Sequence, residues 1–141
     1  MNSLPITLVA TAVLALLYVW LSVRVTIARS RSKIGLGSGA ETSAALGQEH
    51  TASPLLVAVR SHGNFAEYVP ISLILLALLE LTGADRRFLV GLASALVVAR
   101  LMIAFGMGRA APNPFRAGGS LLQWTVIVVA SAYGLWLVFA R

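Results

Sequence analysis

The chain has 141 residues, of which 58% are hydrophobic and only 11% are charged, and its mean hydropathy is +0.86. This composition excludes an ordinary soluble domain and predicts an integral membrane protein. There is no cysteine, which excludes disulfides, a thiol nucleophile on the protein and cysteine-based metal sites. The net charge of +6 is interpreted as a signal of topology and of contact with anionic lipid, not of nucleic-acid binding.

Uncharged stretches at the two ends of the chain predict the first and last membrane spans. Residues 1–23 and 117–140 carry no charge, and at about 1.5 Å rise per residue each is long enough to cross a hydrocarbon core of roughly 30 Å. Trp124 lies toward one end of the last stretch, and Tyr133 and Trp136 lie toward the other, as interfacial anchors do. We expect helices over about 4–29 and 117–140.

The second span must contain charge. Only twelve uncharged residues separate Glu67 from Glu80, which is too few to cross a bilayer. The helix must therefore begin earlier, and Ser53 followed by Pro54 has the residue types of an N-cap and a first helical position. We expect this helix over about 54–82.

The third span, over about 86–108, requires Arg100 as a buried member. Gly83 and Ala84 are expected to form the tight turn before it, with Asp85 as its cap. The resulting prediction is an all-α, four-helix membrane bundle that forms one domain over residues 1–141.

Four spans place both termini on one side of the membrane, and the 30–53 loop and the 109–116 connection on the other. The loop side carries more basic residues near the spans (Arg29, Arg31, Lys33, Arg109 and Arg116) than the terminal side (Arg86, Arg87 and Arg141). By the positive-inside rule we expect the 30–53 loop to be cytoplasmic and the termini to be external.

The most informative segment is RSHGNFAEYVP, residues 60–70, because it places ionisable side chains inside a predicted span. Arg60, Asn64 and Glu67 are spaced i, i+4 and i+7, so they lie within about 60° of one another on a helix and form one polar stripe. His62 points away from this stripe and is expected to pack against another helix.

Glu67 and Arg100 are expected at similar depth. Counted from the turn between their helices, they lie about 21 Å and about 18 Å into the membrane at the helical rise. Opposite charges at one level reduce each other's desolvation cost, so we expect them to form an ion pair or to share a bound ligand. The sequence leaves open whether such a pair mainly fixes the register of the helices or contacts a ligand.

The pattern Arg-x-His-x-Asn-x-x-Glu-Tyr-x-Pro on a four-span chain resembles the MAPEG family, the membrane-associated proteins in eicosanoid and glutathione metabolism, in its bacterial-type members. The segments Val23-Arg24 and Ala99-Arg100-Leu101, together with Arg116, extend this resemblance over nearly the whole chain. It implies a homotrimer in the bacterial inner membrane, with glutathione as co-substrate between subunits and a lipophilic substrate that arrives from the bilayer.

The resemblance also implies roles for individual residues. Glutathione would be bound by Arg24, Arg60, Asn64, Glu67 and Arg100. Arg116 would be catalytic, because its positive charge would stabilise the glutathione thiolate. Glutathione carries two carboxylates and one ammonium, so several arginines and one glutamate complement its charges.

Three hypotheses for function follow. The first is a glutathione-dependent transferase or peroxidase that acts on lipophilic electrophiles or lipid hydroperoxides. The second is a noncatalytic membrane protein of the same fold that binds lipid or a protein partner. It is suggested by Ile103 and Met107, where family enzymes often carry tyrosine or histidine, and by Gly63, where some carry arginine. The third, a small transporter subunit, has only the buried charges in its favour.

Overall fold

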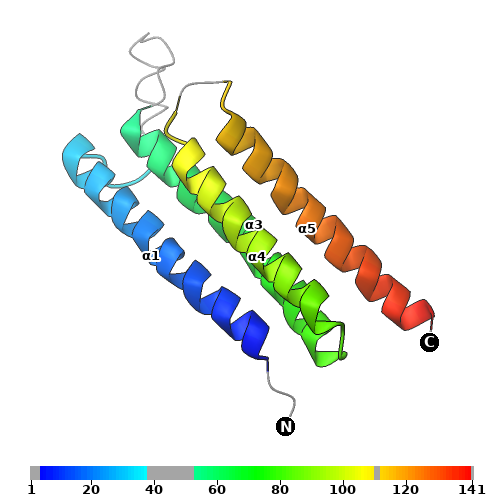
Figure 1. Cartoon of the computed structure of the whole chain (residues 1–141). Coiled ribbons are helices and arrows are strands. Elements are labelled where there is room, and N and C mark those ends of the chain that lie inside the picture. Colours follow the sequence, from blue (N-terminus) through cyan, green and yellow to red (C-terminus); the bar gives the residue numbers. More distant parts are fainter. Residues whose placement is uncertain (1–3, 38–52, 110–111, 141) are drawn as a thin grey trace.

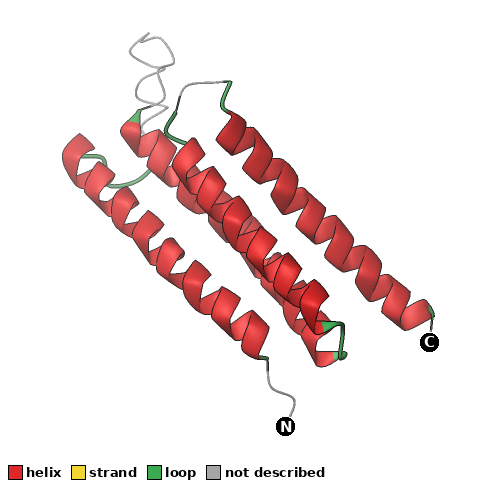
Figure 2. Cartoon of the chain, in the orientation of Figure 1, coloured by secondary structure: helices red, strands yellow, loops and turns green. Residues whose placement is uncertain are grey.

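The computed structural model describes residues 4–37, 53–109 and 112–140, and these contain four helices and no strand (Figures 1 and 2). The helices are α1 (Pro5–Ser32), α3 (Pro54–Leu81), α4 (Arg86–Gly106) and α5 (Pro114–Phe139). Each is long and apolar enough to cross a membrane. The predicted all-α, four-helix fold class is confirmed.

The helices run alternately up and down, with α1 and α5 at the two flanks of the bundle and α3 and α4 between them (Figure 1). The most extensive helix contacts join α4 to α5 and α1 to α3. Of the four helices, α4 has the largest fraction of buried residues. The start of α1 and the end of α5 lie at the end of the bundle where α3 turns into α4 (Figure 1). We call this the terminal end, and the opposite end the loop end.

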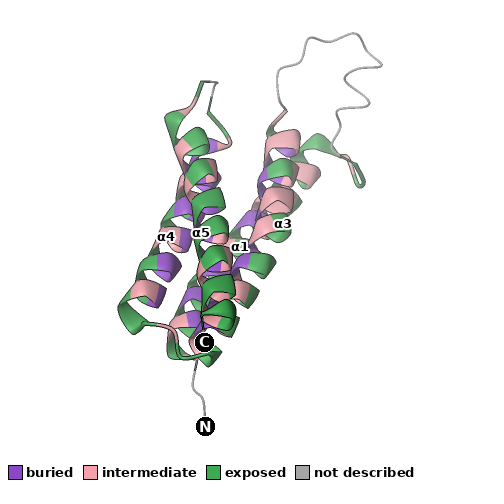
Figure 3. Ribbon diagram, turned by 90° about the vertical axis from the view of Figure 1, so that its right-hand side faces the viewer, coloured by how far each residue is buried: buried purple, intermediate pink, exposed green. Residues whose placement is uncertain are grey.

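Many large apolar side chains face outward, including Leu16 at 74% exposure and Phe139 at 83%. In water such a surface would aggregate, whereas in a bilayer it faces acyl chains of equal polarity. Figure 3 shows this distribution, with buried positions confined to the inner faces of the helices.

The local sequence explains three of the four helix starts. The Ser53 hydroxyl accepts a hydrogen bond from the Leu56 amide at 3.1 Å, and the Asp85 carboxylate accepts one from the Phe88 amide at 2.9 Å, so both predicted caps are confirmed. Asn113 caps α5. Gly83 has φ +75°, a backbone conformation that a side chain would strain, and it allows the sharp turn from α3 into α4.

The fourth helix is capped by a residue from a distant part of the chain. Leu4 stands at the N-cap position of α1 and offers no side-chain acceptor. The Glu80 carboxylate accepts hydrogen bonds from the Ile6 amide at 2.9 Å, the Thr7 amide at 2.8 Å and the Thr7 hydroxyl at 2.6 Å instead. Glu80 therefore joins the end of α3 to the start of α1 and supplies negative charge where the helix dipole favours it.

Two helix boundaries differ from the sequence prediction by three residues, and the others agree to within two. Helix α1 continues to Ser32 and ends at Lys33 in the left-handed conformation, so it runs past the predicted end at residue 29. Helix α5 begins at Pro114 rather than at residue 117, because Asn113 is a better cap than any later residue. Most of the expected 30–53 loop, residues 38–52, lies outside the described residues, as does Arg141.

Candidate functional site

Arg100 is the most deeply buried charged side chain in the described part of the chain, with 1% of its surface exposed. Its Nη2 donates a hydrogen bond to Oδ1 of Asn64 at 3.1 Å, and its guanidinium carbon lies 5.0 Å from the centre of the Phe65 ring. Its Nε and Nη1 atoms are buried and have no hydrogen-bond partner. Buried arginine donors are costly to leave unpaired, so within the described residues this site is under-satisfied.

The expected direct ion pair between Glu67 and Arg100 does not form among the described residues. Glu67 is exposed, whereas Arg100 is directed to Asn64, slightly less than one helical turn nearer the loop end. The stacking of the guanidinium on Phe65 fixes this direction. Both residues nevertheless belong to one neighbourhood, because Asn64 and Glu67 line the same cavity.

This cavity, about 680 Å³, runs along one face of α3 at the loop end and is closed by the end of α4 and the first turn of α5. Four of the predicted site residues line it, namely Arg60, Asn64, Glu67 and Arg116. The remaining lining is Leu56, Val57, Val59, Gly63 and Met107. We call it the arginine cavity. Two arginines against one carboxylate give its lining a net positive charge, which suits an anionic ligand with one cationic group.

The position of Arg116 depends on a close approach between α4 and α5. A Cβ atom at Gly106 would lie 2.7 Å from the backbone nitrogen of Arg116, so only glycine allows this approach. Asn113 holds the same junction: its Nδ2 donates to the Gly106 carbonyl at 2.8 Å, and its Oδ1 accepts from the amides of Phe115 at 2.9 Å and Arg116 at 3.4 Å. The backbone of Arg116 is therefore fixed from two directions.

Arg24 does not join the arginine cavity within one subunit. Its guanidinium lies 4.9 Å from the centre of the Trp20 ring, and the residue lines a separate cavity of about 600 Å³ between α1 and α3. Arg31 also lines that second cavity. The structure thus brings together four of the predicted residues, places Arg100 directly behind Asn64, and leaves Arg24 apart.

His62 packs toward α1, as its helical position predicts. Its ring centre lies 4.7 Å from that of Tyr18, and the Tyr18 ring also lies 5.6 Å from Phe65. Because Phe65 in turn supports Arg100, this aromatic group links α1 to the buried guanidinium. Within the described residues no group of three or more histidine, cysteine or acidic side chains could hold a metal ion.

Sequence reasoning missed two positioning residues, Asn113 and Gly106. An asparagine between two prolines is a cap signal that could have been recognised. Nothing in the sequence indicates that Gly106 contacts α5, because that contact depends on how the helices pack. Of the two positions where family enzymes often carry tyrosine or histidine, Ile103 is buried and Met107 lines the arginine cavity.

The four membrane-spanning helices and the arginine cavity at one end of the bundle place the chain among small polytopic membrane proteins. The chain belongs to the MAPEG family, whose family model matches residues 7–136. The expected family membership is therefore confirmed, and this family is generally associated with glutathione.

Two curated relatives are similar to part of the chain. The inner membrane protein YecN of Escherichia coli strain K12 is 30% identical over 84 residues, which are 60% of this chain and 63% of the relative. YecN of E. coli O6:H1 strain CFT073 gives the same values. The match thus spans slightly less than two thirds of each relative. No solved structure matches.

Proposed function

We propose that the protein is a glutathione-dependent transferase or peroxidase that acts on lipophilic electrophiles or lipid hydroperoxides. The observation that carries this proposal is the arginine cavity, which gathers Arg60, Asn64, Glu67 and Arg116 at one end of a membrane bundle. The arginines match the carboxylates of glutathione and Glu67 matches its ammonium. A ligand that reached past Asn64 would also meet the unpartnered donors of Arg100.

In the proposed reaction the protein supplies binding and charge, and the glutathione sulfur makes the new bond. Arg116 stabilises the thiolate, and the thiol proton passes to water. With an electrophile, the sulfur attacks carbon and forms a thioether, while the bond from that carbon to its leaving group breaks and the leaving group departs as an anion that takes a proton from water. With a hydroperoxide, the sulfur attacks the terminal oxygen and releases the alcohol, and a second glutathione converts the resulting sulfenate to the disulfide and water.

The proposed assembly is a homotrimer with glutathione between subunits. Arg24 lies apart from the arginine cavity within one chain, so its proposed role requires that it reach the cavity of a neighbouring subunit. The exposed position of Glu67 also suits a site that a second subunit completes. Cross-linking in native membranes tests the subunit number.

The proposed location is the bacterial inner membrane, with the 30–53 loop cytoplasmic and the termini external. The similarity to the inner membrane protein YecN supports this location, and the charge bias at the loop end supports the orientation. The chain has no cysteine, so single cysteines at Lys33 and Asp85 can be labelled in whole cells with an impermeant maleimide. Labelling of the Lys33 position without the Asp85 position contradicts the orientation.

A second candidate, a noncatalytic protein of the same fold, is favoured by one observation. Met107 places a thioether in the arginine cavity where family enzymes often carry tyrosine or histidine. Purified protein mixed with glutathione distinguishes the two. An enzyme gives ultraviolet thiolate absorbance and conjugates a generic electrophile, and both signals fall in Arg116→Ala but not in the control Arg87→Ala, whose residue lies at the other end of the bundle. Absence of both signals in the unmodified protein contradicts the proposed function.

A further inference from the structure

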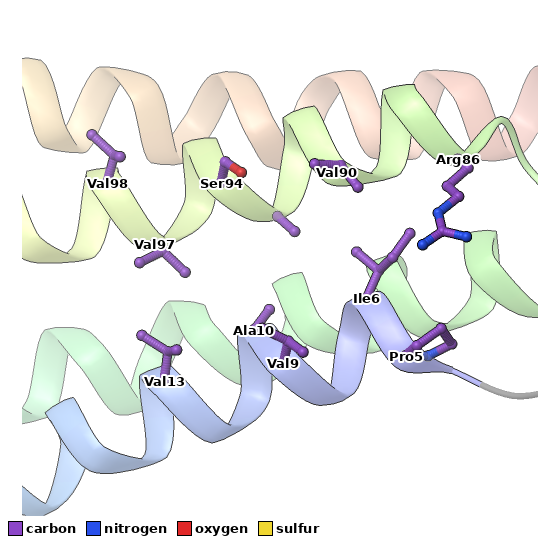
Figure 4. Close-up of a pocket in the computed structure, with 11 residues that line it drawn as sticks. Pro5, Ile6, Val9, Ala10, Val13, Arg86, Val90, Ser94, Val97 and Val98 are labelled. Carbon is purple, nitrogen blue, oxygen red and sulfur yellow. The ribbon is translucent and has the colours of Figure 1, made fainter.

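A third cavity lies at the terminal end of the bundle, between α1 and α4 (Figure 4). Its volume is about 480 Å³. We call it the outer groove, and its lining is Pro5, Ile6, Val9, Ala10, Val13, Arg86, Val90, Ala93, Ser94, Val97 and Val98. Nine of these eleven side chains are hydrocarbon only. The exceptions are Ser94 in the wall and Arg86 at one end.

We propose that the outer groove binds one anionic glycerophospholipid, with an acyl chain along the groove and the phosphate on Arg86. This site does not depend on the proposed glutathione chemistry. It lies at the opposite end of α4 from the arginine cavity, since Arg86 precedes Arg100 by fourteen residues, or about 21 Å of helix.

The first argument is the direction of Arg86. Figure 4 shows its side chain turned from the start of α4 toward Ile6 and Pro5 at the start of α1, over the end of the groove. Glu80 lies near enough to attract Arg86 electrostatically, but in the described part of the chain its carboxylate accepts hydrogen bonds from Ile6 and Thr7 and none from Arg86, so the guanidinium keeps its hydrogen-bond donors. The guanidinium thus remains available to a phosphate, which it can bind through two parallel hydrogen bonds.

The second argument is the size and surface of the groove. From Arg86 to Val98 it follows α4 for twelve residues, or about 18 Å, and half of a hydrocarbon core of roughly 30 Å is about 15 Å. It therefore has the depth of one leaflet, with its charge at the interface and its apolar wall below. Val9 at 65% and Val98 at 48% remain exposed in the subunit, so the wall is open to an acyl chain.

The test compares lipid retained by the full-length protein after purification in mild detergent from membranes that contain phosphatidylglycerol and phosphatidylcholine. A basic group near a membrane surface contributes enough to anionic-lipid binding that its loss should lower retained phosphatidylglycerol about fivefold. Arg86→Gln should show this loss, and the matched control Arg87→Gln, whose residue does not line the groove, should not. Ser94→Trp, which fills the groove from an exposed position, should lower retention of both lipids.

Equal retention in Arg86→Gln and the unmodified protein overturns the proposal, and so does equal loss in the two arginine variants. A photo-reactive residue at position 94 identifies the occupant. Cross-linking to phospholipid supports the site, whereas cross-linking to a second copy of the chain shows that a subunit fills the groove and also overturns it. Glutathione binding measured on the same samples reports separately on the proposed function.

Discussion

The two ends of the bundle differ in how completely a charged side chain is hydrogen-bonded. At the terminal end the Glu80 carboxylate is half-buried and accepts three hydrogen bonds from α1. At the loop end the Arg100 guanidinium is almost fully buried, and two of its three nitrogens have no partner. A satisfied buried charge stabilises a fold, whereas an under-satisfied one costs stability and is retained for another reason. The comparison therefore supports a structural role for Glu80, and it agrees with the binding role that we propose for the neighbourhood of Arg100.

The largest expected effect on stability comes from Glu80→Ala. The substitution leaves the Ile6 and Thr7 amides without their acceptor, and each unsatisfied buried donor costs about 1–3 kcal/mol, so we expect a total loss of about 2–4 kcal/mol. Unfolding in detergent micelles, followed by circular dichroism, measures this. The control is Glu67→Ala, which removes an exposed carboxylate and should leave stability unchanged while it weakens glutathione binding. Equal destabilisation by the two variants contradicts the comparison.

The next effect is expected from Gly106→Ala at the loop end. The added methyl group would lie 2.7 Å from the Arg116 nitrogen, and overpacking of this kind costs about 1–3 kcal/mol. Because α5 must shift, thiolate formation should fall as well. The matched control is Gly91→Ala in the same helix, where a Cβ has no neighbour within 4 Å. That variant should be neutral or more stable, and thiolate formation should be retained.

Arg100→Met should separate stability from binding. Replacing an incompletely paired buried charge by an apolar side chain of similar length is often neutral or stabilising, so we expect unfolding to change by less than about 1 kcal/mol or to become harder. Glutathione binding, measured by calorimetry, should be lost. Arg100→Lys keeps the charge without the planar fork and should also bind more weakly. A variant that unfolds readily and binds normally would reverse the assignment.

In the described part of the chain, Gln123 has one paired and one unpaired polar atom, so its hydrogen bonding is intermediate between that of Glu80 and that of Arg100. Its Nε2 donates to the Ser72 hydroxyl at 2.8 Å, and its buried Oε1 has no partner in the described residues. Hydrogen bonds between membrane helices contribute about 0.6 kcal/mol on average, so Gln123→Leu should change stability by no more than about this amount. The same unfolding assay measures it, and a loss above 2 kcal/mol would contradict this expectation.

The sequence predicted those features that local chemistry determines. Hydropathy and length predicted four spans, and capping residue types predicted the starts at Ser53 and Asp85. Helical spacing predicted that Arg60, Asn64 and Glu67 share a face, and all three line one cavity. Equal depth predicted that Arg100 pairs with Glu67 or shares a ligand with it, whereas Arg100 donates its hydrogen bond to Asn64, another member of the same stripe.

What the sequence could not predict depends on side-chain direction and packing. Depth alone does not distinguish Asn64 from Glu67 as the partner of Arg100, because they are less than one turn apart and the Phe65 ring decides between them. In the sequence, Glu80 indicates only where an uncharged stretch ends. Leu4 has no side-chain acceptor, which indicates that the start of α1 needs a capping group from elsewhere. It does not indicate which residue supplies that group.

The bond between Glu80 and the start of α1 also bears on biogenesis. The first helix emerges from the ribosome more than seventy residues before its capping carboxylate has been synthesised. Until then, the first amides of α1 can donate hydrogen bonds only to lipid headgroups and water. The first turn of α1 is therefore completed only after helix α3 has been synthesised and inserted, which couples the placement of the first membrane helix to the arrival of the second.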